Sequence, residues 1–245
     1  MPNIEIAAEK IFNIFGMPIT NALLMSWISA IVLIVGALVI SKKLSAVPSF
    51  FQNIVEYFIE KALDLMEGIF GSRERAQEYF PIVVTIFLFI LVSNWLGILP
   101  GTGSVGLLKM YEGKEVFTPL FRSAASDLNF TLGLAIITVL LVNIYGIRSL
   151  GWGKHLSKFF TFKGPIDFFV GILEFISEFA KMISFSFRLF GNVFAGEILL
   201  TIMAFLAPFF IPVPFLALEV FVGFIQALVF SMLAMIFISV AVSHH

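Results

Sequence analysis

Residues 165–206 read PIDFFVGILEFISEFAKMISFSFRLFGNVFAGEILLTIMAFL, which is too long for an upright membrane helix. At about 1.5 Å per residue such a helix measures about 60 Å, twice the roughly 30 Å hydrocarbon core of a bilayer. The segment must therefore tilt steeply, bend or break. A second long apolar run covers residues 215–243. With the short turn 207–214 between them, the two runs predict a hairpin of inclined helices.

The composition indicates a protein built for lipid. Hydrophobic residues make up 60% of the 245 residues and charged residues 13%, whereas soluble domains have about 25% charged residues. Neither the net charge of −1 nor any basic run suggests nucleic-acid binding. The chain has no cysteine, which excludes disulfides, thiolate metal sites and cysteine nucleophiles. We expect a single polytopic membrane domain over residues 1–245, with no cofactor and no metal.

Three further charge-free runs predict the other spans, at residues 11–41, 79–100 and 128–147. Each is long enough to cross a bilayer. The first is too long for the core of a secretory signal and lacks the positively charged start of one, so we expect a retained helix that ends at Lys42–Lys43. The absence of a transit peptide favours a bacterial membrane or an organelle-encoded gene.

Segment 49–70 has a different pattern, because apolar residues repeat at helical spacing opposite a mostly acidic face. It predicts an amphipathic helix on the membrane surface or against another helix. Its acidic face either contacts a protein partner or is simply solvated. The expected fold is therefore an all-α integral membrane protein. It has about five membrane-embedded helices plus one amphipathic surface helix, and the last two spans are long and steeply inclined.

Positive charge predicts the orientation. Segment 148–164 contains Arg148, Lys154, Lys158 and Lys163 and no acidic residue. By the positive-inside rule it lies in the cytoplasm. Counting five spans from this segment places the N-terminus outside, loop 101–127 outside and the C-terminus in the cytoplasm.

Arg188 stands in an apolar stretch, although a guanidinium cannot lose its charge there and costs about 2.5–3.5 kcal/mol at the membrane centre. At about 100° per residue, small and polar side chains form one stripe with it along the helix. They are Glu174, Ser177, Lys181, Ser184, Gly191, Asn192 and Ala195. Such a stripe faces protein or water, and its counter-charge is expected on another subunit. The alternative is a structural arginine that snorkels to the headgroups or pairs with an acid.

Glu197 lies nine residues after Arg188, on the opposite side of the helix. Glu219 shares a face of the last helix with Gly223 and Gln226, and the predicted hairpin brings Glu219 towards Glu197. Two buried carboxylates in contact would share a proton. They would form a proton relay or an ion-uptake site, or they are two acids near a water-filled rim.

Several motifs carry a strong resemblance to a known family. They are FRLFGNVFAGEILL (187–200), LEVFVGFIQALVFSML (218–233), SNWLGILPG (93–101), SDLNFTLGLA (126–135) and ILEFISEFAKMISFSFRLFGN (172–192). In this order and spacing, the chain resembles subunit a of F-type ATP synthases over nearly its whole length. The resemblance implies a non-catalytic stator subunit in the bacterial inner (plasma) membrane, with the mitochondrial inner membrane as the alternative. The implied partners are a c-subunit ring, b-type peripheral stalk subunits, the rest of the complex and the lipid bilayer.

The resemblance also implies roles for individual residues. Arg188 matches the arginine that meets the ring carboxylate and blocks proton leakage between two aqueous half-channels. The other implied ion-translocating residues are Asn192 and Gln226 beside that arginine, Glu197 and Glu219 in the outer half-channel, Glu174 towards the inner exit, and Asp127 with Asn129 at the outer mouth. Many relatives have a histidine and a glutamate where this chain has Glu197 and Glu219, which affects the order of proton uptake. His155, His244 and His245 lie in predicted cytoplasmic parts and do not replace that histidine.

Two other classes of protein compete with this interpretation. A stand-alone ion or solute transporter often has duplicated halves with interrupted helices, and this chain has no such internal repeat. An assembly protein would leave the polar stripe unexplained. The chain contains no GxxxxGK[ST] phosphate loop, so nucleotide chemistry belongs to other subunits. The coupling ion, H⁺ or Na⁺, depends on the ring, and we assume H⁺.

Overall fold

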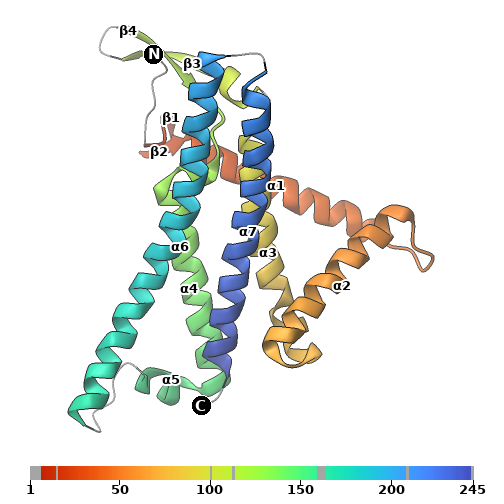
Figure 1. Ribbon diagram of the computed structural model, residues 1–245, viewed down its shortest axis with the longest axis vertical. Coiled ribbons are helices and arrows are strands. Elements are labelled where there is room, and N and C mark those ends of the chain that lie inside the picture. The colour runs from red at the N-terminus through yellow and green to blue at the C-terminus, as the bar shows by residue number, and fades with distance from the viewer. Residues whose placement is uncertain are drawn as a thin grey trace.

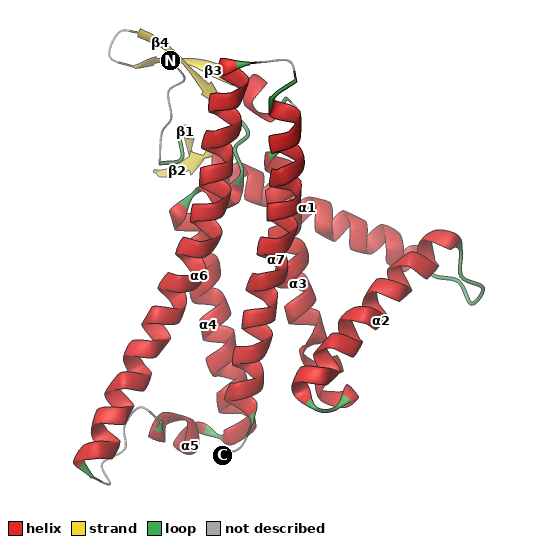
Figure 2. Ribbon diagram, viewed as in Figure 1, coloured by secondary structure: helices red, strands yellow, loops and turns green. Residues whose placement is uncertain are grey.

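The computed structural model describes residues 7–14, 16–99, 101–111, 114–158, 164–207 and 210–243. Lys163, His244 and His245 lie outside these ranges. Within them the chain is helical apart from two short β-hairpins and loops (Figure 2). Five of the described helices are long and apolar enough to cross a membrane. The chain is therefore an all-α integral membrane protein, as the sequence predicts.

The stretch that is too long for an upright span forms one unbroken helix. Helix α6 (Pro165–Leu206) has 42 residues and α7 (Pro212–Val242) has 31. Both begin at a proline, which suits the first turn because its missing N–H has no helical partner there. The two helices contact each other and run side by side from the turn that joins them (Figure 1). A break in α6 is thus excluded, and its length requires that it incline in a bilayer or extend beyond it.

The remaining long helices divide into a bundle and an arm. Helices α3 (Arg73–Gly97) and α4 (Leu128–Leu150) both contact α7, and α4 also contacts α6. Buried Ile90, Leu189 and Phe230 share the core of this bundle. Helices α1 (Asn21–Lys42) and α2 (Phe50–Phe70) extend away from it as an arm (Figure 1). One side of α6 therefore packs in the core, while its other side is left uncovered by this chain.

The helix ends differ from those expected from charge-free runs. The first residues of the predicted span belong to a hairpin of β1 (Lys10–Ile14) and β2 (Met17–Thr20), so the helix starts only at Asn21. Thr20 caps α1 by accepting a hydrogen bond from the backbone N–H of Leu23. Helix α3 starts six residues before the predicted 79, and α4 ends three residues after the predicted 147. Hydropathy detects only the apolar part of a helix, whereas capping residues and charged end turns set its true ends.

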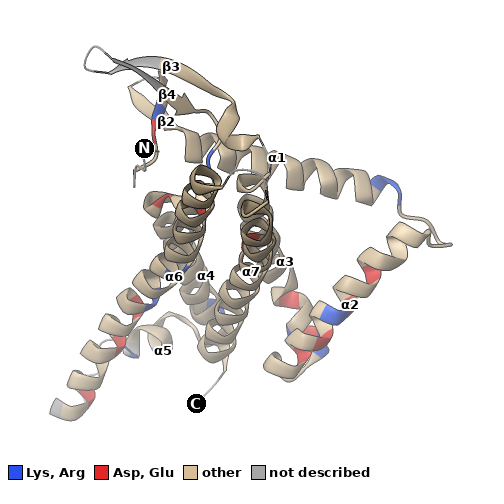
Figure 3. Ribbon diagram, turned by 45° about the horizontal axis from the view of Figure 1, so that its top comes forward, with Lys and Arg blue, Asp and Glu red and all other residues tan. Residues whose placement is uncertain are grey.

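Helix α2 is amphipathic, and its acidic face has a partner within the chain. Arg73 at the start of α3 forms ion pairs with Glu60 at 2.6 Å, Asp64 at 3.0 Å and Glu67 at 3.5 Å. Hydrogen bonds from Lys61 and then from Arg73 lower the pKa of Asp64 below its usual value. The acidic residues of α2 are visible near the turn to α3 in Figure 3. The sequence predicted either a protein partner or solvation for this acidic face, and it did not predict the ion pairs with Arg73.

The connecting segments gather at the two ends of the bundle. Hairpin β1–β2, hairpin β3 (Gly106–Tyr111) with β4 (Lys114–Pro119), and the α6–α7 turn lie at one end (Figure 1). The short helix α5 (Trp152–Ser157) and the last turn of α7 lie at the other end. Residues 16–20 and 114–127 thus share one end of the bundle, and the side of the membrane on which that end lies stays a prediction.

Candidate functional site

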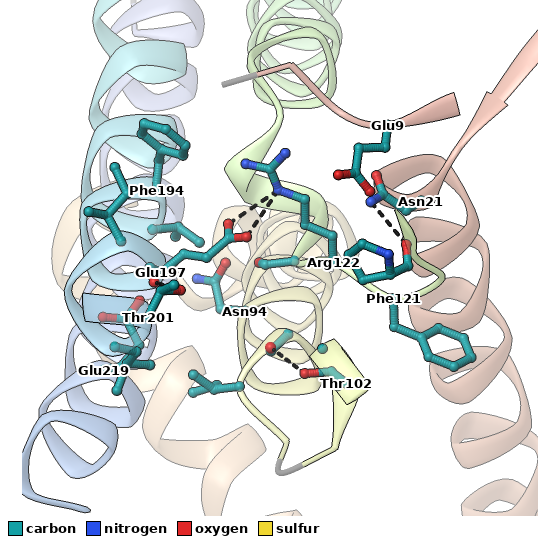
Figure 4. Close-up of a pocket in the computed structure, with 18 of the residues that line it drawn as sticks. Glu9, Asn21, Asn94, Thr102, Phe121, Arg122, Phe194, Glu197, Thr201 and Glu219 are labelled. Atoms are coloured by element: carbon teal, nitrogen blue, oxygen red, sulfur yellow. Dashed lines mark hydrogen bonds and ion pairs between the residues drawn. The ribbon is translucent and has the colours of Figure 1, made fainter. Parts of the chain in front are cut away.

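A cavity of about 720 Å³ opens at the hairpin end of the bundle, between α3, α6, α7 and the segment 117–123 (Figure 4). Its charged lining consists of Glu9, Arg122, Glu197 and Glu219. Three acidic groups and one cation thus share a space walled by membrane helices. Glu197 and Glu219 were expected here from the sequence, whereas Glu9 and Arg122 were not.

Arg122 and Glu197 form the central ion pair of the cavity. The Nε of Arg122 lies 3.1 Å from Oε1 and 3.3 Å from Oε2 of Glu197 (Figure 4). The Arg122 side chain is 8% exposed and that of Glu197 37%. Arg122 is also held by Ser126 Oγ, which accepts from Nε at 3.1 Å, and by the Ala7 carbonyl, which accepts from Nη1 at 3.1 Å. The loop cation is thus fixed by partners from three parts of the chain.

Glu219 enters the cavity from α7 and is only 9% exposed. Its carboxylate lies directly against the backbone of Gly196, so a Cβ at position 196 would overlap it. Because Glu197 is the next residue, the α6–α7 hairpin brings both acids to one cavity. The sequence predicted this meeting, although it did not identify the glycine that permits it.

Helices α3 and α7 are in close contact beside the cavity, and side-chain hydrogen bonds to the backbone join them. Asn94 donates from Nδ2 to the Gly223 carbonyl at 3.1 Å, and Trp95 donates from Nε1 to the Val220 carbonyl at 3.1 Å. A Cβ at Gly223 would come within 3.2 Å of the Asn94 side chain. The Oδ1 of Asn94 is buried without a hydrogen-bond partner in the described part of the chain. Asn94 thus lines the cavity with one side-chain acceptor that has no partner among the described residues.

A hydrogen bond between side chains joins the exposed side of α6 to α7. Asn192, on the exposed side, donates from Nδ2 to Oε1 of Gln226 at 2.7 Å. Gln226 on α7 is 3% exposed. The two amides that the family resemblance places beside the arginine thus contact each other, with Gln226 inside the bundle.

The predicted stripe on α6 divides into two halves. The half that surrounds Arg188 is exposed; it consists of Ser184, Arg188, Gly191, Asn192 and Ala195. Within the described ranges Arg188 forms no ion pair, and its Nη2 donates to Ser184 Oγ at 3.3 Å. A Cβ added at Gly191 would meet nothing within 4 Å. This half is therefore an open face with an uncompensated guanidinium.

The other half of the stripe is partly covered. Glu174, Ser177 and Lys181 are half-buried. Lys181 pairs with Glu178 at 2.7 Å and lies 5.0 Å from the centre of the Phe237 ring. Glu178 was not predicted as a member of the stripe, because at about 100° per residue it lies about 80° to one side of Arg188.

Glu178 belongs to a buried network at the α5 end of the bundle. Asn143 on α4 donates from Nδ2 to Glu178 Oε2 at 3.2 Å, and its Oδ1 lies 3.0 Å from Nε2 of His155. Burial first, and then nearby Lys158, lowers the pKa of His155, while Glu178 acts in the opposite direction. His155 does not line the Glu197 cavity, which agrees with the expectation that it does not replace the family histidine.

Asp127 has a clear local role. It caps α4 by accepting from the backbone N–H of Asn129 at 3.0 Å and from Nδ2 of the same residue at 3.2 Å. It does not line the cavity, but it follows Ser126, which holds Arg122. A part for Asp127 and Asn129 in ion translocation stays a prediction.

These features define a class of protein: a multi-pass helical membrane protein with an acid-lined cavity on one side of a long helix and an unpaired arginine on the other. Residues 23–239 match the family described as ATP synthase A chain. The chain belongs to this family, that of ATP synthase subunit a, and it sits within the ATP synthase complex as a membrane-sector subunit.

Individual relatives agree with this assignment. The chain is 34% identical over 236 residues to ATP synthase subunit a of Moorella thermoacetica, which covers 96% of this chain and 97% of that protein. It is also 34% identical to ATP synthase subunit a of Campylobacter concisus, over 88% of each chain. The same identity to the Geobacter sulfurreducens protein covers 89% of this chain and 86% of the relative.

Proposed function

We propose that this chain is the non-catalytic stator subunit that carries protons to and from a rotating ring of c-subunits. The observation that supports this most strongly is the division of α6 into two chemical sides. Glu197 faces the acid-lined cavity, whereas Arg188 lies on the exposed side with no acidic partner among the described residues. One helix therefore offers a proton-accepting chamber and a permanent positive charge that are separated from each other.

The cavity serves as the uptake half-channel in this proposal. Among the described residues that line the cavity, Glu9, Glu197 and Glu219 are acidic and Arg122 is basic. In this proposal the neighbouring carboxyl groups are the sites between which a proton is passed through the cavity. Arg122 holds Glu197 at a fixed place, and Glu219 against Gly196 is the more buried acid, the one that passes the proton towards the ring. The coupling ion is H⁺.

Arg188 acts on the ring carboxylate. A guanidinium stays charged even in an apolar setting, so it draws a passing carboxylate into its ionised form and releases its proton. The same fixed charge repels a proton that would otherwise cross directly between the half-channels. Exposed Gly191 and Ala195 allow a ring helix to approach closely, and Asn192 with Gln226 supplies polar neighbours. Glu174, beside Ser177 and Lys181, leads to the exit half-channel at the α5 end.

The energy available from each proton supports a rotary complex as the setting of this chain. Each proton that crosses about 100 mV releases about 2.3 kcal/mol, so several crossings have to be summed by a rotor to drive one costly reaction. The chain works with the c-ring and b-type peripheral stalk subunits. It lies in a bacterial inner (plasma) membrane, with its N-terminus outside and its C-terminus in the cytoplasm.

The test is ATP-driven acidification of inverted membrane vesicles that carry Arg188→Ala in the assembled complex. Lys42→Ala removes an equal charge from an exposed helix end and serves as the matched control. We expect the Arg188 variant to assemble, to lose pumping and to gain passive leak, while the control pumps normally. Normal pumping by an assembled Arg188→Ala complex would refute the proposal. Purification of the chain without a c-ring would favour a stand-alone transporter instead.

A further inference from the structure

A second pocket, of about 250 Å³, lies at the end of the bundle opposite the Glu197 cavity. It is formed by the first turns of α3, the last turn of α4 and the end of α7. Arg75, Glu78, Tyr79, Tyr145 and Arg148 contribute its chemistry. The proton path proposed above uses none of these residues.

The two arginines of this pocket outnumber its single acidic residue. In the described part of the chain, neither Arg75 nor Arg148 forms an ion pair or a side-chain hydrogen bond. Arg73, only two residues before Arg75, is paired with acids of α2. Glu78 lines the same pocket but pairs with neither arginine there, so the lining keeps an excess of one positive charge.

Two tyrosines complete the lining, and their rings are held in place. Tyr79 is 5% exposed; its ring centre lies 5.0 Å from that of Phe70 and, edge to face, 5.0 Å from that of Tyr145. Neither tyrosine hydroxyl has a hydrogen-bond partner within the described ranges. The pocket thus brings two guanidinium groups and two phenolic O–H donors together on rigid elements.

The location matches the headgroup level of a bilayer. Arg75 is in the first turn of one candidate span, and Arg148 is in the last turn of another. Basic pockets between spans on the cytoplasmic side bind phosphate-bearing headgroups, and guanidinium groups form paired hydrogen bonds with phosphate. We propose that this pocket is a binding site for a phosphate group, either that of an anionic phospholipid or that of free phosphate.

The experiment uses the complete complex, purified in detergent and freed of lipid. Its affinity for phosphatidylglycerol, phosphatidylcholine and inorganic phosphate is measured for wild type and for R75Q+R148Q. K42Q+K43Q removes the same charge from the exposed end of α1 and is the matched control. The catalytic head can bind phosphate itself, so the readout is the difference between variants.

We expect R75Q+R148Q to bind phosphatidylglycerol about 30-fold more weakly, since each basic group near a charged lipid surface contributes about fivefold. The control should bind as wild type does. If only the affinity for inorganic phosphate falls, the site stands and free phosphate is its ligand. If the double variant does not assemble, R75Q and R148Q alone should each weaken binding about fivefold. Unchanged affinity for every probe, or an equal loss in K42Q+K43Q, overturns the proposal.

Discussion

Replacing Gly196 by alanine tests whether the place of Glu219 governs proton uptake. The added Cβ would occupy the space of the Glu219 carboxylate. Overpacking costs about 1–3 kcal/mol, while alanine gains about 0.5–1 kcal/mol over glycine inside a helix. The stability of the assembled chain should therefore fall by about 2.5 kcal/mol at most. If the Glu219 carboxylate moves to relieve the overlap, the same cost of about 1–3 kcal/mol falls on its position rather than on stability, and it corresponds to about a 5- to 150-fold loss of the productive Glu219 arrangement.

The assay is ATP-driven proton pumping in inverted vesicles, with assembly verified by co-purification with the ATPase head. Gly133→Ala is the matched control, because it also lies in a helix and its Cβ would meet nothing within 4 Å. We expect Gly196→Ala to pump at least about fivefold more slowly and Gly133→Ala to pump normally. Adding Glu219→Asp, which shortens the acid by one methylene, should restore part of the rate. Normal pumping by an assembled Gly196→Ala complex would show that the position of Glu219 does not matter.

Three further predictions concern charged contacts. Arg122→Gln and Glu197→Gln should each slow proton pumping. Because both changes break the same ion pair, the increase in activation free energy in the double variant should be about 0.5–3 kcal/mol smaller than the sum of the two single increases. Additive increases would show that the two residues do not act as a pair. Since burial, and then Lys158, lowers the pKa of His155, its stabilising effect is complete above the unfolded value of about 6.5 and declines as pH falls below it. The melting temperature of the detergent-solubilised complex should fall less at acidic pH in His155→Gln than in wild type. If the melting temperatures of the two proteins depend on pH in the same way, His155 does not contribute to the pH dependence of stability. Arg73→Ala should lower the melting temperature only slightly despite its three ion pairs, because these are exposed to solvent; a large fall in the melting temperature would point to a buried role.

Sequence patterns predicted the helices well where the pattern is local. The length of α6 and its polar stripe follow from spacing along one helix, as do the opposite directions of Arg188 and Glu197. The start of α1 was predicted ten residues too early, because a hairpin can be as free of charge as a membrane span. In the same way, Arg73 lay outside the pattern of α2, so its neutralisation of the acidic face could not be seen.

The candidate site was predictable only in part. Glu197 and Glu219 were brought together by the expectation of a hairpin, and the structure places both in one cavity. Arg122 gave no such signal, since it stands in a loop without periodicity. Its partner is 75 residues away, and nothing in the spacing of either residue indicates the other.

The sequence by itself determined that this chain is a helical membrane protein, and which side of α6 carries the arginine. These properties depend on hydrophobicity and on the 3.6-residue repeat, which act over a few turns. The tertiary structure decided which charges meet: Arg122 with Glu197, Arg73 with the acids of α2, and Glu219 with the bare backbone of Gly196. Such contacts arise from the packing of segments distant in the chain, where a single Cβ or loop position decides whether two groups can touch.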